Sequence, residues 1–184
     1  MELYQGKPSD LSARQEREQR VYELLERLAI PYTRTDHAPA QTMEDCVEID
    51  KILGVAMCKN LFLCNRRKTD FYLLMMPAEK PFRTKELSAQ LGTARLSFAD
   101  EAAMLELLDI HPGAVSVMGL MNDRDGRVRL LIDEELLGCA SVGCHPCVNT
   151  ASLRLTTDDL LNRFLPEVGH AYRPVRLIGA DPVT

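Results

Sequence analysis

Two neighbouring apolar segments constrain the fold of this 184-residue chain more than any other feature. The sequences AMCKNLFLC at 56–64 and DFYLLMMP at 70–77 each have the length and residue types of a β-strand, and the polar turn NRRKT separates them. The run FYLLMM at 71–76 is far too short to span a bilayer. We therefore expect two strands of a globular core here.

Helical and strand patterns follow one another along the rest of the chain. Apolar spacing predicts helices over 10–29, from 42 to Gly54, over 84–92 and over 100–108, and a last helix capped by Thr156 or Thr157. Strands are predicted at 31–37, 94–98, 150–156 and 174–179, and the segments 114–120 and 127–133 are predicted to form a hairpin around the turn NDRDG. This mixture indicates an α+β fold, a single domain with a mixed, mostly antiparallel sheet flanked by helices.

Composition argues against several classes of protein. The chain is 46% hydrophobic, which is enough for a sizeable core. Its net charge of −5 argues against a protein that binds DNA or coats RNA with a broad basic face, but it allows local contact with the end of an RNA. The N-terminus MELYQGKPSD lacks the order of a signal peptide, so we expect no membrane contact and a cytoplasmic location, where the six cysteines stay thiols.

The loop SVGCHPCVNTAS at 141–152 suggests a metal site, a redox pair or a substrate-binding loop. Cys144 and Cys147 have the spacing of half a zinc knuckle, yet the other four cysteines form no second close pair, and a redox pair normally opens a helix. We therefore expect no metal and no cofactor, and metal or redox chemistry stays open as the less favoured alternative. His145 and Asn149 are polar groups that a loop can present to a ligand, although spacing alone favours a plain structural turn.

Lys59 shares the apolar face of its predicted strand with Met57, Leu61 and Leu63. An unpaired charge is costly to bury, so its amine either reaches water at the end of the strand or points at a phosphate or carbonyl oxygen of a ligand. Without other information, the first alternative is favoured.

The segment HPGAVS at 111–116 is a further candidate. Pro112 and Gly113 form a turn signal, and glycine lets backbone N–H groups come close enough to a ligand to stabilise an oxyanion, although an ordinary turn is more common. Ser116 ends this segment, and His37 precedes the second predicted helix, where a histidine is more often structural. The sequence has no GxSxG, HExxH or glycine-rich phosphate loop, so a covalent nucleophile is not expected.

Several of these segments, in this order, resemble the YbaK/ProRS-associated domain family, and within it the freestanding prolyl-tRNA editing proteins of the PrdX or ProXp-ala type. The similar stretches are HAPAQTMEDC, CKNLFL, FYLLMMPAEK, ARLSFADEAAMLELL, HPGAVSVMGLMND, VRLLIDEELL, VGCHPCVNTAS and TTDDLLNRFL. The resemblance covers residues 15–178, which gives the expected domain and leaves an N-terminal extension at 1–14 and a tail at 179–184.

The resemblance implies a trans-acting deacylase that hydrolyses the ester of alanine mischarged on proline tRNA, with prolyl-tRNA synthetase as a candidate partner. The implied catalytic residues are Lys59, Gly113 and His145, and the substrate-binding candidates are Asn60, Pro112, Ser116, Asn149, Thr150 and His37. Backbone N–H groups around Gly113 would take the carbonyl oxygen, and Lys59 would hold that oxygen or the terminal phosphate. His145 would orient the RNA end, and the free 2′-hydroxyl of the terminal adenosine would help to shuttle the proton.

Two positions depart from the family's pattern. The family usually has a glycine a few residues before Pro-Gly, where this chain has LLDI at 107–110, so the loop is expected to enter the site at another angle. Cys144 and Cys147 stand where relatives have other residues.

The second site of an editing enzyme must accept alanine and exclude proline, which calls for a small apolar pocket. Met118, Val115 and Ile49 are candidates for its lining. The basic groups that could contact RNA are Arg66, Arg67 and Lys68, or Arg124, Arg127 and Arg129, although solvated turns explain both equally well. The alternative functions are hydrolysis of a tRNA that carries cysteine, serine or 2-aminobutyrate, and binding of aminoacyl-tRNA or a synthetase without hydrolysis.

Overall fold

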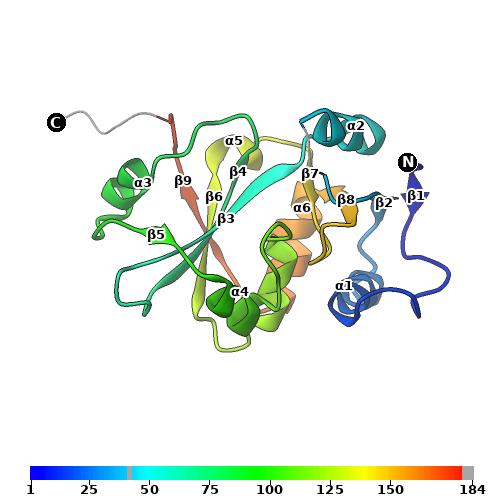
Figure 1. Ribbon diagram of the computed structural model, residues 1–184, viewed down its shortest axis with the longest axis horizontal. Helices are drawn as coiled ribbons and strands as arrows, with labels where there is room; N and C mark the ends of the chain where they lie inside the picture. Colours follow the sequence, from blue (N-terminus) through cyan, green and yellow to red (C-terminus); the bar gives the residue numbers. More distant parts are fainter. Residues whose placement is uncertain (41–42, 180–184) are drawn as a thin grey trace.

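The computed structural model describes residues 1–40 and 43–179, which form two β-sheets with helices packed around them (Figure 1). The strands are β1 (Tyr4–Gln5), β2 (Tyr32–Asp36), β3 (Cys58–Cys64), β4 (Phe71–Pro77), β5 (Ser97–Phe98), β6 (Val128–Asp133), β7 (Ser141–Cys144), β8 (Ala151–Thr156) and β9 (Tyr172–Val175). The helices are α1 (Glu16–Arg27), α2 (Met43–Leu53), α3 (Thr84–Leu91), α4 (Glu101–Leu108), the 3-10 helix η1 (Val117–Asn122), α5 (Glu134–Leu137), α6 (Thr157–Asp159), the π-helix η2 (Leu160–Phe164) and α7 (Leu165–Glu167). The predicted α+β class is confirmed.

The larger sheet has the strand order β5-β3-β4-β6-β9 and is mixed. Its β3–β4 hairpin, predicted from the two apolar segments, pairs Lys59 with Met76 and Leu61 with Leu74. β4 and β6 are parallel, as are β6 and β9. Every residue from Phe71 to Met76 is buried, because β4 lies inside the sheet and both of its faces are covered.

The two faces of the β3–β4 hairpin contribute to two hydrophobic clusters. Phe62 and Met75 belong to the main core, whereas Leu63 and Met76 belong to a second cluster that includes Leu87 of α3. Because side chains alternate along a strand, residue 59 lies on the α3 side of the sheet and residue 60 lies on the side of the main core.

The smaller sheet has the order β1-β2-β8-β7, and all of its pairs are antiparallel. It meets the larger sheet at an isolated parallel bridge between Met57 and Gly143, which we call the sheet seam. A Cβ on Gly143 would lie 2.9 Å from Met57 Sδ and 3.1 Å from Met57 Cα, so the close approach of the two backbones requires glycine here. The main core includes Leu73 of one sheet and Leu153 of the other, so the two sheets share one core.

The predicted hairpin of 114–120 with 127–133 is wrong. Residues 117–122 form η1, and β6 pairs with β4 and β9 instead. Ser116 caps η1 by accepting a hydrogen bond from the Met118 N–H at 3.2 Å. A Cβ on Gly119 would lie 2.6 Å from Ile110 Cδ1, so this segment packs against the end of α4 and its turn rather than against a strand. A short apolar run does not by itself distinguish a strand from a helix.

Three element boundaries also differ from the prediction. Asp10 accepts a hydrogen bond from the Ser12 N–H at 2.8 Å and so stabilises a turn, and α1 begins only at Glu16. The last strand ends at Val175, because the Ile178 N–H donates to the Glu86 carboxylate at 2.6 Å instead of to a strand. The last helix is interrupted by η2, although Leu160 and Phe164 are buried as its pattern predicts.

Two predictions fall partly outside the described residues: residue 42, where the second helix was expected to begin, and residues 180–184 of the expected tail. In the described part of the chain, no helix combines the length and apolar character needed to cross a membrane.

Candidate active site

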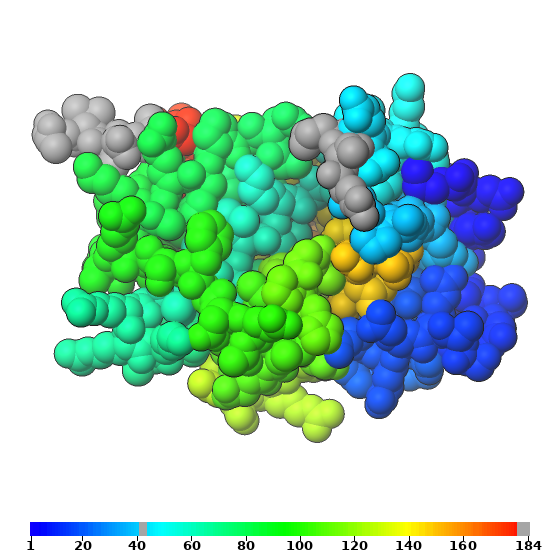
Figure 2. All heavy atoms as spheres, viewed as in Figure 1, coloured from blue at the N-terminus to red at the C-terminus, as the bar shows by residue number. Residues whose placement is uncertain are grey.

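The Pro-Gly turn and the loop after β7 meet at one place. The Ser116 hydroxyl donates to the backbone carbonyl of His145 at 2.6 Å. Gly113 has a φ of +87°, which favours glycine, and a Cβ built on it would lie 3.6 Å from Asn149 Nδ2. Pro112 and Gly113 are exposed, whereas Ser116 is fully buried, so Ser116 holds the loop in this arrangement instead of facing a ligand. In Figure 2 the yellow-green surface around residues 112–118 adjoins the gold surface around residues 145–152.

His37 lies beside the same loop. Its backbone N–H donates to the carbonyl of Thr150 at 3.0 Å, and its Nδ1 lies 2.8 Å from the carbonyl of Ala38. A carbonyl accepts only, so Nδ1 donates this hydrogen bond, and Nε2 lies 2.8 Å from the Ser152 hydroxyl. The rings of His37 and His145 are 6.3 Å apart, so the two histidines belong to one cluster.

The two ring nitrogens of His145 differ in their contacts with the described residues. Its Nδ1 donates to the carbonyl of Ala151 at 2.9 Å, and the Ser152 hydroxyl lies 3.5 Å from the same nitrogen. No hydrogen bond from the described residues engages Nε2. Burial lowers the pKa of His145, and the neighbouring His37 acts in the same direction, while the Ala151 carbonyl opposes them. The neutral ring therefore offers the Nε2 lone pair as a hydrogen-bond acceptor or a base.

The cysteines of this loop are buried. Cys144 is fully buried, and burial raises the pKa of the Cys147 thiol to about 12 and that of the nearby Cys58 thiol to about 12. Within the described ranges, no group of three or more His, Cys, Asp or Glu side chains could hold a metal ion. These thiols fill space in and around the main core and are poor candidates for a nucleophile, which must be a thiolate.

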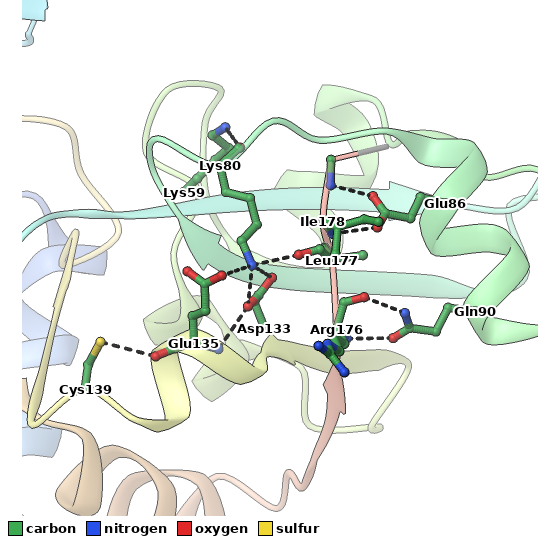
Figure 3. Close-up of polar contacts among 11 residues, drawn as sticks. Lys59, Lys80, Glu86, Gln90, Asp133, Glu135, Cys139, Arg176, Leu177 and Ile178 are labelled. Atoms are coloured by element: carbon green, nitrogen blue, oxygen red, sulfur yellow. Dashed lines mark hydrogen bonds and ion pairs between the residues drawn. The ribbon is translucent and has the colours of Figure 1, made fainter. Parts of the chain in front are cut away.

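Lys59 and Asn60 lie on β3, just after Met57, which is bridged to Gly143 of β7. The Lys59 ammonium donates to the backbone carbonyl of Lys80 at 2.8 Å (Figure 3), and no hydrogen bond among the described residues joins it to the Pro-Gly turn or to His145. Asn60 donates from Nδ2 to the Cys58 carbonyl at 3.2 Å, and its buried Oδ1 has no described partner. The structure therefore brings His37, Gly113, Ser116, His145, Asn149 and Thr150 together. Among the described residues, the sheet seam brings the segment before Lys59 next to the strand that precedes His145.

The departure from the family's glycine before Pro-Gly has a local explanation. Asp109 ends α4 in the left-handed conformation, with a φ of +51°, which aspartate adopts more readily than most residues other than glycine. Its carboxylate pairs with Arg20 and lies 3.5 Å from Arg17 of α1. These ion pairs help to stabilise the left-handed backbone conformation of Asp109, which a glycine would adopt more easily.

The residues expected to line the pocket differ in exposure. Met118 is fully buried and Ile49 is 4% exposed, whereas Val115 is half-buried next to the exposed Gly113. Of the three, Val115 is the one placed to contact a ligand at the turn.

The two expected basic groups differ in their pairing. Arg127 pairs with Glu106 at 2.5 Å, Arg129 pairs with Asp70 at 3.0 Å, and Lys68 pairs with Asp100. No ion pair with a described residue engages Arg66, Arg67 or Arg124, and all three are exposed. Their charges are available to a phosphate.

Two residues at these places, Ser152 and Lys80, were not predicted from the sequence. Ser152 is fully buried and contacts both histidines of the cluster, and Lys80 holds the Lys59 ammonium through its carbonyl. The alternation of β8 could have placed Ser152 on a defined face, but a lysine in a loop carries no sequence signal for this role.

Comparisons with known proteins find a matching family, similar sequences and a similar structure. Residues 37–162 match the family described as the aminoacyl-tRNA editing domain. The prolyl-tRNA editing protein ProX of Acetoanaerobium sticklandii is 31% identical over 159 residues, which cover 86% of this chain and 96% of that protein. The prolyl-tRNA synthetase associated domain-containing protein 1 of Danio rerio is 35% identical over 80% of each chain. A crystal structure of a candidate trans-editing enzyme for prolyl-tRNA synthetase superposes with a TM-score of 0.67 at 17% identity, covering 90% of this chain and 99% of that chain, and so shares the fold.

Proposed function

The chain belongs to the aminoacyl-tRNA editing domain family and is an aminoacyl-tRNA deacylase, and we propose that its substrate is alanine esterified to proline tRNA. The observation that carries this proposal is the cluster of His145, Asn149 and the exposed turn at Gly113, which presents unused polar groups at one place. The name of the Acetoanaerobium sticklandii relative supports proline tRNA as the RNA, and the name of the zebrafish relative supports prolyl-tRNA synthetase as a further partner.

Editing of alanine has a physical reason. A synthetase site built for proline rejects the smaller alanine only by lost apolar contacts, which are worth about 1–3 kcal/mol. A second site that admits alanine and excludes the pyrrolidine ring of proline by size supplies the missing discrimination.

The Pro-Gly turn is suited to stabilise the developing oxyanion. The Ala114 N–H donates to the His111 carbonyl at 3.2 Å, whereas no hydrogen bond within the described residues uses the N–H groups of Gly113 and Val115. Water would add to the ester carbonyl, and these two N–H groups would hold the resulting oxyanion. Collapse of this tetrahedral intermediate would then break the bond between the carbonyl carbon and the ribose oxygen. The ribose oxygen takes a proton and leaves as a tRNA hydroxyl, and alanine is released.

His145 is suited to orient the terminal ribose. Its neutral Nε2 would accept a hydrogen bond from the 2′-hydroxyl of the terminal adenosine, and this hydroxyl would pass the proton between water and the leaving oxygen. Asn149 and Thr150 lie in the same loop and would contact the same end of the RNA, with His37 beside them.

Lys59 and Asn60 would contact the substrate from β3. An ammonium has three donors, and the Lys80 carbonyl engages one, so two remain for a phosphate or for the ester carbonyl oxygen. The unpartnered Oδ1 of Asn60 would accept a donor from the substrate, such as the ammonium of the amino acid.

The test is deacylation of Ala-tRNA(Pro) by purified protein. The Lys59→Ala variant should lose about 100-fold or more in kcat/KM, by analogy with the loss of an oxyanion donor. Lys85→Ala is the matched control, because Lys85 is exposed on α3, and it should keep wild-type activity. Wild-type activity in Lys59→Ala would remove Lys59 from the mechanism, and tRNA binding without any turnover by the wild type would establish a non-catalytic module.

A further inference from the structure

Lys80 lies in the loop between β4 and α3, and its ammonium contacts Asp133, Glu135 and the carbonyl of Leu177 (Figure 3). It lies 2.9 Å and 2.8 Å from the two carboxylate oxygens of Asp133, 2.7 Å from Glu135 Oε1 and 2.8 Å from the carbonyl of Leu177. Its side chain is 11% exposed. An ammonium has three donors, so these partners leave none for a ligand.

The partner that matters most is Asp133. Its side chain is 1% exposed, whereas that of Glu135 is 66% exposed. A buried carboxylate without its partner is strongly destabilising, whereas an exposed ion pair contributes little. Asp133 is itself fixed at the end of β6, because its Oδ1 accepts the Glu135 N–H at 3.0 Å and caps α5.

Burial by itself would lower the pKa of Lys80, but the hydrogen bonds and charges of Asp133 and Glu135 outweigh it and raise that pKa. The side chain therefore stays charged and ties the loop to β6 and to the segment after β9.

The backbone of the same residue holds Lys59. The carbonyl of Lys80 accepts the Lys59 ammonium at 2.8 Å, and the described residues offer that ammonium no other hydrogen bond or ion pair. Pro81 follows directly and restricts Lys80 to extended conformations, which narrows the directions that this carbonyl can take. The direction of the Lys59 ammonium thus depends on the backbone of Lys80, whose own ammonium is fully engaged by other partners.

We propose that Lys80 is a positioning residue for the deacylation reaction: its buried ion pair with Asp133 fixes the carbonyl that aims the Lys59 ammonium at the substrate. The proposal rests on the role given to Lys59 in the proposed function. It assigns Lys80 no contact with the substrate.

The first experiment measures position without activity. The rate of reductive methylation of Lys59 is compared by mass spectrometry with that of Lys51, which is exposed on α2 of the same molecule. The paired variant Lys80→Met/Asp133→Asn removes both charges and keeps an acceptor for the cap of α5. The Lys59 to Lys51 ratio should rise about fivefold, the population change expected for loss of one ordinary hydrogen bond. The matched control Glu135→Gln removes the exposed partner and should change the ratio less than about twofold.

The second experiment asks whether Lys80 acts through Lys59. In the wild-type background the paired variant should lose about tenfold in kcat for Ala-tRNA(Pro), and in the Lys59→Ala background it should cause no further loss. Equal losses in both backgrounds, or an unchanged methylation ratio, would overturn the proposal. If the wild type hydrolyses no mischarged tRNA, the proposed function fails and the methylation ratio still decides whether Lys80 fixes Lys59.

A milder variant covers the case in which the paired variant does not fold. Pro81→Ala leaves every charge in place but lets Lys80 leave the extended region. It should raise the methylation ratio in the same direction, and an unchanged ratio would count against the proposal.

Discussion

Among the described residues, the protein engages only one ring nitrogen of His145 in hydrogen bonds. Its Nδ1 is bound to the Ala151 carbonyl, and burial lowers its pKa, so the ring stays neutral and Nε2 stays an acceptor. In the proposed function, this division of the two nitrogens would let Nε2 accept a hydrogen bond from an RNA hydroxyl.

This state of His145 predicts the pH dependence of deacylation. Because the folded pKa lies below the usual value of about 6.5, the neutral form persists as the pH falls through that value, and activity should decline only at lower pH. The measurement is kcat/KM for Ala-tRNA(Pro) between pH 5 and 8, corrected for spontaneous hydrolysis of the ester. His145→Asn should be at least about tenfold slower and should lack the acid limb. An acid limb centred at or above pH 6.5 in the wild type would contradict this account.

At the scale of single residues, the sequence indicated where chemistry lies but not how it is held. The Pro-Gly and His-Pro segments carry local signals, because turns and loops depend on neighbouring residues. Ser152 carries no such signal, because its contact with His37 joins residues 115 positions apart. For the same reason, the hydrogen bond from the Lys59 ammonium to the Lys80 carbonyl could not be predicted from the sequence.

At the scale of elements, the sheet seam brings β3 close to β7. Met57 and Gly143 are bridged across the two sheets, which places the segment before Lys59 next to the segment before His145. The β3–β4 hairpin was predictable because its two apolar segments and the polar turn between them are local features of the sequence. The parallel pairing of β6 with β4 was not, because a parallel pair is joined by a crossover whose ends are distant in sequence.

The seam gives a prediction for stability. Gly143→Ala places a Cβ within 2.9 Å of Met57 Sδ and 3.1 Å of Met57 Cα, so the sheets must shift. We expect a loss of about 1–3 kcal/mol in the free energy of unfolding, measured with urea, and a fall in deacylation. Gly138→Ala is the matched control, because its φ is −83° and the new Cβ would meet the Glu135 carbonyl at an ordinary 3.6 Å. Equal effects of the two substitutions would show that the seam is not tight.

At the scale of the whole molecule, the two sheets share one core, and the candidate site lies where they meet (Figure 1). The net charge of −5 makes broad electrostatic binding of RNA unfavourable, so contact must be local. Arg66 and Arg67, at the turn between β3 and β4, are exposed and have no ion pair with a described residue.

This predicts a small and specific salt dependence of tRNA binding. The variant Arg66→Ala/Arg67→Ala should weaken binding and reduce the slope of log K against log salt by roughly 1.5–2, because it removes two phosphate contacts. The variant Arg127→Ala/Arg129→Ala is the matched control, because both arginines already pair with carboxylates, and it should leave the slope nearly unchanged. A larger change of the slope in the control variant would show that the RNA contacts the group with Arg127 and Arg129 instead.

The central claim is that this deacylase selects alanine on proline tRNA by size. The most direct test is single-turnover hydrolysis of one tRNA(Pro) charged in turn with alanine, serine, cysteine, 2-aminobutyrate and proline. We predict that alanine is released fastest and that proline is released at least about 100-fold more slowly than alanine. Release of proline at the rate of alanine, or faster release of another amino acid, would contradict the claim.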